Sequence, residues 1–234
     1  MAGDVTDYRH YVTEHLERVI EILAHISFGD YAKDIDTSQL AEDEFADVYC
    51  GLDLLVDDLA EARRELDAQN AFNVLRSEAW RVATGTFATS GAFADALLTV
   101  LGQGTDLRRA SYFEIDRESN HAVCVGQWDA KGGRATMGLT LPPSVWHHIK
   151  GRRILELTTA AVSGNAKGEI VELMEQRGVL AIAAAPCGDP DNPMGFIVFS
   201  DDTPSREWSD TEKGLLVEVA RIVTTKVAQI RAEE

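Results

Sequence analysis

The segment from Gly178 to Leu216 constrains the fold of this chain more than any other part of its sequence. An apolar run that Gly178 opens and Pro186 closes predicts a buried strand. Residues 189–193, Asp-Pro-Asp-Asn-Pro, favour a turn because they pre-set or tolerate turn dihedral angles. The apolar residues 194–200 then predict the returning strand, so the segment begins as an antiparallel pair.

A long helix is predicted directly after these two strands. Ser209 can accept a backbone N–H at the helix start, and Glu212 can reach back to the N–H of Ser209, which is the pattern of a capping box. The helix is expected over residues 209–232, and one face of it carries a continuous apolar stripe: Leu215, Leu216, Val219, Ile222, Val223 and Val227. It should therefore pack against the sheet.

This order of strand, turn, strand, capping box and helix resembles the C-terminal half of a GAF domain. The resemblance rests on Gly178-Val179, Pro186, Met194-Gly195-Phe196 and Arg206-Glu207-Trp208-Ser209, and it covers residues 72–232. It implies an α+β fold in which helices flank an antiparallel sheet. No catalytic residue belongs to the pattern, so it implies a sensory domain and no enzymatic activity of this chain.

The middle of the chain supplies the other elements that such a sheet needs. Alternating or continuous apolar runs predict strands at 109–115, 122–128, 135–141 and 154–157. Helical spacing predicts short helices at 93–101, 145–149 and 166–176. Antiparallel strands with segregated helices are typical of the α+β class.

The first 71 residues have a different pattern, with apolar residues every three or four positions in two stretches, 5–26 and 45–66. Such spacing is that of a coiled-coil seam. We therefore predict that residues 1–71 form a helical module separate from the domain at 72–234, and that it joins two copies of the chain. The predicted dimer seam consists of Leu16, Val19, Leu23, Ile26, Phe45, Val48, Leu52, Leu55, Leu59 and Leu66.

The link between the two seam helices resembles the connector of a HAMP module. Gly29-Asp30 ends the first helix, Ile35 and Leu40 are isolated apolar residues, and Asp43-Glu44 opens the second helix. The resemblance implies a parallel four-helix bundle built from two chains. HAMP modules usually follow a membrane helix and none precedes this one, so a plain helical hairpin stays open as an alternative.

Charge restricts the partners of the chain. The formal net charge is −17, and residues 1–71 alone carry 18 acidic against 5 basic residues, a net −13. Such a field repels nucleic acids and anionic membranes. The sequence has no secretion signal, no apolar run near the roughly 20 residues of a membrane helix, and three widely spaced cysteines. We therefore expect a cytoplasmic protein with reduced thiols.

The resemblance to GAF domains implies a ligand pocket under the segments that cover one face of the sheet. The candidate pocket residues are Trp128, Trp146, His147, His148 and Cys124, together with the segment 158–170. Trp and His combine an apolar body with a polar tip, which suits an aromatic ligand. The alternative is that Trp146 and Ile149 pack inward while a histidine points to solvent.

The candidate cofactors differ in how well the residues match them. The cyclic-nucleotide signature is incomplete, because only Asn165, Lys167 and Glu169 approach it. A covalent bilin needs a Cys followed by His, and neither Cys124 nor Cys187 has one. Haem stays open, since a histidine could supply its axial ligand: His121, His147 or His148. No metal site is predicted.

Sensing and structural dimerisation are the two leading interpretations. In the first, a ligand or partner at the GAF-like domain changes the packing of a homodimer. The helix over residues 209–232, called the exit helix below, passes the change to an output domain such as a histidine kinase. We expect that output domain to follow Glu234 or to belong to a partner protein. The alternatives are a ligand-free dimerisation module and, from another class, a reductase of methionine sulfoxide that uses Cys124 and Cys187 as a neighbouring pair.

Overall fold

The computed structural model describes residues 2–31, 45–133, 136–160, 168–203 and 206–233. The chain forms two compact units, Met1–Ala71 and Phe72–Glu234. Helix α2 (Ala46–Ala83) begins in the first unit and ends in the second. None of the helices in the described ranges is long and apolar enough to cross a lipid bilayer.

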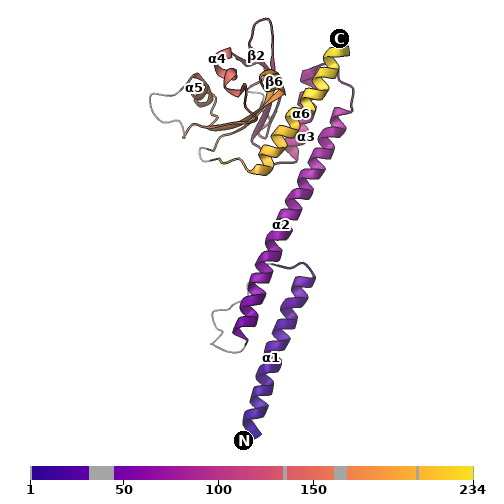
Figure 1. The fold of residues 1–234 in the computed structure, drawn as a ribbon, viewed down its shortest axis with the longest axis vertical. Helices are drawn as coiled ribbons and strands as arrows, with labels where there is room; N and C mark the ends of the chain where they lie inside the picture. Colours follow the sequence, from indigo (N-terminus) through magenta and orange to yellow (C-terminus); the bar gives the residue numbers. More distant parts are fainter. Residues whose placement is uncertain (1, 32–44, 134–135, 161–167, 204–205, 234) are drawn as a thin grey trace. The chain divides into compact units, whose positions relative to one another are not determined.

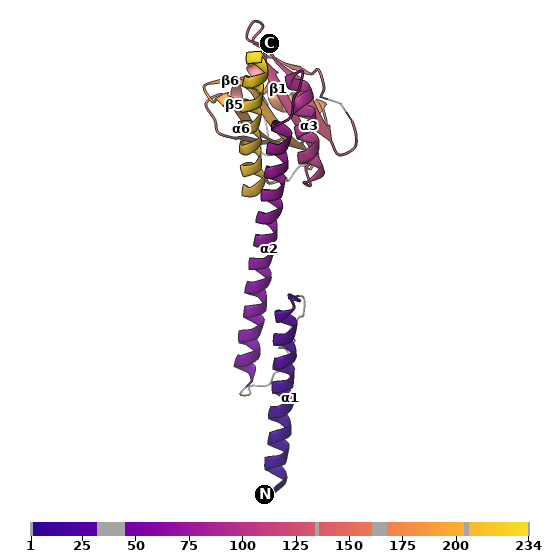
Figure 2. The ribbon, with the colours of Figure 1, turned by 90° about the vertical axis from the view of Figure 1, so that its right-hand side faces the viewer.

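The first unit consists of α1 (Ala2–Ser27) and the first part of α2, which lie side by side and run in the same direction (Figure 2). The contacts between them establish this direction. The rings of Tyr11 and Phe45 are 5.9 Å apart, and His15 Nδ1 lies 3.0 Å from the hydroxyl of Tyr49, so each pair is 34 residues apart in sequence. A hairpin of antiparallel helices would not keep this spacing constant. The predicted connector residues Ile35, Leu40 and Asp43-Glu44 lie outside the described residues.

The contact between α1 and α2 uses only part of the predicted seam. Its core comprises Ile22, Tyr49, Leu52 and Val56, with Val19, Ile26, Tyr31 and Phe45 packed against it. Other seam residues are exposed: Leu16 (49%), Leu23 (45%), Val48 (43%), Leu55 (44%) and Leu66 (50%), while Leu59 is half-buried. Each helix therefore has one apolar face against its neighbour and a second apolar face in solvent.

The second unit is built on a six-stranded antiparallel sheet with the order β3-β2-β1-β6-β5-β4. Strands β1 and β6, which are far apart in the sequence, are neighbours at its centre. The strands are β1 (Arg109–Ile115), β2 (Ala122–Asp129), β3 (Thr140–Leu141), β4 (Leu155–Thr158), β5 (Ala181–Asp189) and β6 (Asn192–Asp201).

Helices cover both faces of this sheet (Figure 1). One face packs against α3 (Ser90–Gln103), α6 (Asp210–Glu233) and the end of α2. The opposite face carries α4 (Pro143–Trp146), the 3₁₀ turn η1 (His147–Ile149) and α5 (Glu169–Gln176). The predicted α+β class with an antiparallel sheet and flanking helices is confirmed.

The start of α6 has the predicted capping box. Ser209 Oγ accepts the backbone N–H of Glu212 at 3.2 Å, and the Glu212 carboxylate accepts the N–H of Ser209 at 2.9 Å. The two orphan donors at the helix start are thereby satisfied. This fixes where the exit helix begins.

Two predicted boundaries are wrong. The strand expected over 135–141 is only Thr140–Leu141, because a turn at 136–138 precedes it and Gly138 adopts φ +73°, outside the β region. The turn expected over 189–193 is tighter, since Asp189 pairs with Asn192 in the ladder and only Pro190 and Asp191 lie between them.

Candidate functional site

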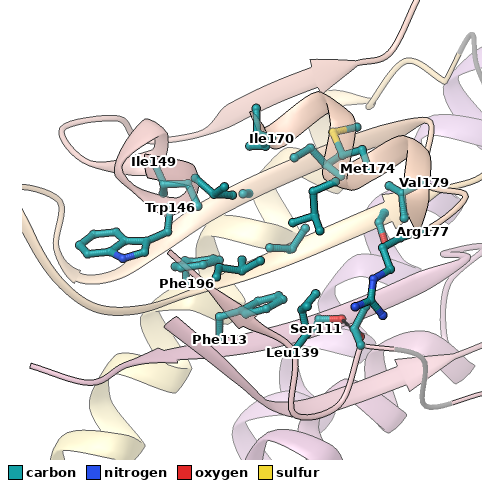
Figure 3. Close-up of a pocket in the computed structure, with 18 of the residues that line it drawn as sticks. Ser111, Phe113, Leu139, Trp146, Ile149, Ile170, Met174, Arg177, Val179 and Phe196 are labelled. Carbon is teal, nitrogen blue, oxygen red and sulfur yellow. Dashed lines mark hydrogen bonds between the residues drawn. The ribbon is translucent and has the colours of Figure 1, made fainter. Parts of the chain in front are cut away.

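A cavity of about 90 Å³ lies between the sheet and the helices α4 and α5 (Figure 3). Strands β1, β4, β5 and β6 form its floor, and α4, η1, α5 and the turn after β2 form its cover. Its walls are mostly apolar. The principal lining residues are Ser111, Phe113, Thr136, Leu139, Leu141, Val145, Trp146, Ile149, Leu155, Ile170, Leu173, Met174, Arg177, Val179, Ile182, Ala184, Phe196, Val198 and Ser200.

One end of the cavity is aromatic. The rings of Phe113 and Phe196 stack across β1 and β6 with centroids 5.0 Å apart and planes 12° apart. Trp146, from α4, lies at the same end and is buried. Its indole Nε1 donates to the carbonyl of Asn120 at 3.0 Å, so its polar atom is already satisfied. This end therefore offers a ligand only apolar surface.

The other end of the cavity carries hydroxyl groups and one cation. Ser111 Oγ and Thr136 Oγ1 lie 3.1 Å apart and are buried, and Ser200, on β6, is also buried. Arg177 follows the last residue of α5, and its guanidinium points toward Ser111 in Figure 3. Among the lining residues that the structure describes, Arg177 is the only charged one.

The same strands contact the cavity and the exit helix. On β5 and β6, Ala184, Phe196 and Val198 line the cavity. Their immediate neighbours face the other way and pack in the core that contains α6: Ala183, Ala185, Ile197 and Phe199. Since successive residues of a strand point to opposite faces, the sheet is a single layer between the cavity and α6.

Of the predicted pocket residues, Trp146 lines the cavity and Trp128 does not. Trp128 packs on the opposite face of the sheet, in the core with α3. A β-bulge causes this, because Tyr112 pairs with Gly126 and Phe113 with Cys124, which leaves Val125 as an extra residue in β2. One extra residue in a strand reverses the side of the sheet to which each following side chain points. The prediction that Trp128 covers the ligand site is therefore wrong.

The two predicted histidines do not line the cavity. His147 and His148 are exposed, while Val145, Trp146 and Ile149 of the same short segment are buried. The ring of His147 packs edge-on against Trp146, with centroids 4.2 Å apart. The inward positions of this segment are taken by apolar side chains, which agrees with the alternative of inward packing. The placement of His147 and His148 in the pocket is thus corrected.

Cys124 is buried on the cavity side of the sheet but is not a lining residue. Burial raises the pKa of its thiol to about 11, although its Sγ donates to the Gly126 carbonyl. Cys187 lies on the opposite face, in the core with α6, and complete burial raises its pKa even further. The two strands are separated by β1 and β6, a distance of roughly 14 Å at the usual strand spacing. The predicted pairing of these cysteines across the sheet is therefore wrong.

The candidate cofactors fit the described walls poorly. The cavity volume of about 90 Å³ is well below the roughly 300–1,000 Å³ of pockets that hold drug-sized ligands, and haem or a bilin is larger still. His121, the third candidate haem ligand, does not line the cavity and bonds through Nδ1 to the Ser119 carbonyl. Asn165 and Lys167 lie outside the described residues, and Glu169 accepts a hydrogen bond from Ser144. The described part of the chain has no cluster of three metal-ligating side chains.

The polar end of the cavity was missed in the sequence. Its residues come from four distant segments: Ser111 from β1, Thr136 from the turn between β2 and β3, Arg177 from the end of α5 and Ser200 from β6. One signal was present, because Ser111 occupies a buried position in step with Phe113 and Ile115 in an otherwise apolar strand. A lone serine on the buried face of a strand is the kind of residue that marks a polar contact in a cavity.

Comparisons with known proteins identify the family. The family model described as GAF domain matches residues 91–227, more than half of the chain. No curated protein gives a significant match. The matched range begins in α3 and ends within α6, so it includes the whole sheet, the cavity and its cover.

Solved structures of low sequence identity share the fold. The GAF domain of an Acinetobacter phosphoenolpyruvate-protein phosphotransferase is 13% identical with a TM-score of 0.54, over 73% of this chain and 96% of that chain. The corresponding Coxiella burnetii domain is 17% identical with a TM-score of 0.54, over 71% and 97%. The phycocyanobilin-bound GAF domain of a cyanobacterial phytochrome is 12% identical with a TM-score of 0.55, over 71% and 97%. The chain therefore belongs to the GAF domain family.

Proposed function

We propose that this chain is a homodimeric, cytoplasmic sensor and relay module of a signalling protein. A small molecule enters the cavity of the GAF domain and favours one of two packings of α6 on the sheet. An output domain, such as a histidine kinase in a two-component system, reads the difference. The observation that carries the proposal is that adjacent residues of β5 and β6 contact the cavity and α6. The proposal assigns no reaction to this chain, so any kinase or cyclase activity would belong to the output domain.

Coupling of this kind requires unequal affinity of the ligand for the two packings. Filling the cavity pushes on Ala184 and Val198, and the layer of side chains behind them is close-packed against α6. Close-packed interiors transmit small displacements because they have little free volume to absorb them. The proposal thus needs only a shift of strands β5 and β6 relative to α6.

The first unit supports the dimer. At about 100° per residue, Leu16 and Leu23 lie within about 20° of each other on α1, some 60–100° from the face that contacts α2. On α2, Val48, Leu55 and Leu66 form a similar stripe beside the face of Phe45, Tyr49 and Leu52. Two parallel helices that each present a second apolar face at such an angle have the geometry of half of a four-helix bundle. A second copy of the chain, as in a HAMP module, would complete it.

Sedimentation of seam variants tests the dimer. Leu55→Lys places a charge in the exposed stripe without touching the core between α1 and α2, and we expect it to convert the dimer to a monomer. Leu54 is the matched control, since it is exposed (67%) and lies more than about 90° from both apolar faces of α2. Leu54→Lys should remain dimeric. A monomeric wild-type protein, or equal behaviour of the two variants, would contradict the dimer.

Two of the structural neighbours place such a domain inside longer chains. The matched region covers 38% of an R. palustris bacteriophytochrome chain and 37% of a Stigmatella aurantiaca phytochrome photosensory core module. This is consistent with the proposal only in that a domain of this fold occurs as one part of a longer chain.

A ligand-free structural dimeriser is the second candidate, and the small size of the cavity favours it. In that case the GAF domain only holds the helices. Native mass spectrometry and thermal denaturation with a ligand panel distinguish the two candidates. A bound mass or a concentration-dependent rise in Tm supports the sensor, because a ligand that binds only the folded state stabilises it. A panel that never shifts Tm supports the structural role.

A further inference from the structure

We propose that the ligand of the cavity is a short-chain monocarboxylate of four to five carbons. Its carboxylate lies at Arg177 and its hydrocarbon tail lies between the sheet and α4. This inference rests on the proposed sensory function and names the chemical class of the molecule that is sensed. The residues at the two ends of the cavity, its volume and the absence of an acidic wall among the described residues each restrict the ligand separately.

The polar end selects an anion. Arg177 carries the only charge in the described lining, and a guanidinium presents five N–H donors in a planar fork that matches a carboxylate. The hydroxyl groups of Ser111, Thr136 and Ser200 border the same end. Since Ser111 and Thr136 share one hydrogen bond, one hydroxyl of that pair and the Ser200 hydroxyl can donate to a ligand. Because the guanidinium has five donors, it can hold a carboxylate in addition to a contact within the protein.

Arg177 lies at the entrance of the cavity, which sets the orientation of the ligand. Arg177 is exposed, whereas Phe113, Trp146 and Phe196 at the far end of the cavity are buried. A carboxylate therefore stays partly hydrated beside Arg177, while the tail enters the dry interior. The opposite orientation would bury the charge against aromatic rings without a hydrogen-bond donor, at a large desolvation cost.

The aromatic end requires a tail without polar groups. The Trp146 N–H is already bonded to Asn120, and the remaining walls there are hydrocarbon: Phe113, Leu141, Val145, Ile149, Leu155 and Phe196. A hydroxyl or carbonyl in the tail would lose its water without gaining a partner. The described lining also has no carboxylate that could hold an ammonium group, which disfavours amino acids.

The volume limits the length of the tail. An apolar protein cavity of about 150 Å³ holds benzene, which has six carbons. By proportion, the cavity of about 90 Å³ holds roughly three to four carbons. With its carboxylate at the entrance, the ligand is therefore an acid such as butanoate or 3-methylbutanoate. Acetate leaves most of the cavity empty, and octanoate exceeds it.

Isothermal titration calorimetry of the full chain at constant ionic strength tests the head group. The probes are 3-methylbutanoate and its neutral isostere 3-methylbutanamide, with acetate and octanoate as length controls. We expect saturable binding of 3-methylbutanoate and at least about tenfold weaker binding of the amide, because hydrogen bonds to charged groups are the stronger ones. Acetate and octanoate should also bind more weakly.

Two arginine variants locate the carboxylate. Arg177→Gln should weaken the binding of 3-methylbutanoate at least about tenfold, because it removes the charge and the planar fork of donors. The affinity for 3-methylbutanamide should stay unchanged. Arg153→Gln is the matched control, since Arg153 is also exposed but does not line the cavity, and it should bind as the wild type does. Equal affinity for acid and amide, or equal effects of the two variants, would overturn the assignment of the head group.

A cavity-filling variant locates the tail. Ala184→Leu places a larger side chain in the floor of the cavity and should abolish binding of 3-methylbutanoate; Val198→Leu is a milder change if Ala184→Leu does not fold. Binding that survives in the folded variant, or no binding to the wild type, would overturn the inference. The dimer and its Leu55→Lys test do not depend on the ligand, so a failure here is distinguishable from a failure of the proposed function.

Discussion

The ring of Trp128 occupies the space where a side chain of residue 102 would begin. A Cβ built on Gly102 would lie 2.0 Å from Cδ2 and 2.2 Å from Cε2 of Trp128. Helix α3 can approach β2 this closely only because Gly102 has no side chain. This contact holds α3 on the sheet face opposite the cavity.

Gly102→Ala should destabilise the GAF domain by about 2 kcal/mol or more, because the ring or the helix must move to admit the methyl group. Gly214→Ala is the matched control. Gly214 also lies in a helix, α6, but a Cβ at this position would have no atom within 4 Å. That substitution should raise stability by up to about 1 kcal/mol. Urea unfolding measures both, and equal effects would contradict the described contact.

The carboxylate of Asp129 joins the ends of β1 and β2. It accepts hydrogen bonds from Arg108 Nη1 at 2.6 Å and from Arg109 Nε at 2.8 Å, and its side chain is 3% exposed. Burial alone would raise the pKa of Asp129, but the hydrogen bonds from Arg109, the Lys131 N–H and Arg108 outweigh it and lower the pKa. The resulting stabilisation is present above the unfolded pKa of about 3.9 and is lost as the pH falls through the folded pKa.

Asp129→Asn should therefore cost about 2 kcal/mol at pH 7 and less at pH 3, because pH 3 lies below the unfolded pKa of about 3.9 and part of the ionic stabilisation is already lost there. Asp202→Asn is the control, because Asp202 bonds to the same Arg108 but is half-exposed and should contribute less. Urea unfolding at the two pH values measures the difference. A loss for Asp129→Asn that does not depend on pH would contradict the ionic origin of this contact.

The three thiols should differ sharply in reactivity. Cys50 is exposed, whereas Cys124 and Cys187 are buried. With a pKa of about 11, only about one Cys124 thiol in a thousand is ionised at pH 8, and the thiolate is the reactive form. Native protein should therefore consume one equivalent of Ellman's reagent quickly and three after unfolding. Rapid reaction of two or three thiols in the native state would contradict this and would support the cysteine-based alternative.

Local chemistry made much of the fold predictable from the sequence. The capping box of Ser209 and Glu212 depends on neighbouring residues only. The strands around Pro186 and Phe196 are apolar runs bounded by glycine, proline and other turn residues. Where a boundary was wrong, as before Thr140, a left-handed Gly138 turned the chain within an apolar stretch.

The cavity was harder to predict because it depends on which side each strand residue faces. The bulge at Val125 moves Trp128 to the far side of the sheet. Its sequence signal is Gly126 within the strand, but such a glycine can equally mark a close approach of another backbone. The polar end depends on Ser111, Arg177 and Ser200, which only the sheet order brings together. His147 and His148 were predicted to line the pocket because of their residue type. The helical turn that buries Trp146 directs them outward.

The parallel homodimer is the central claim, and spin labels on α2 test it most directly. Cys50 is the only exposed cysteine, and Glu61 is an exposed residue on the same side of the helix, about 16 Å along its axis. Pulsed electron paramagnetic resonance would measure the distance between two labels at Cys50, and between two at Glu61→Cys in a Cys50→Ser background.

In a parallel four-helix bundle both sites should give nearly the same distance, about 30–45 Å from the bundle width and the label linkers. In an antiparallel dimer the signed axial offset between the two labels changes by about 33 Å from one site to the other, so the two distances differ unless the twofold axis lies midway between Cys50 and Glu61. Strongly different distances, or no dipolar coupling at either site, would contradict the account.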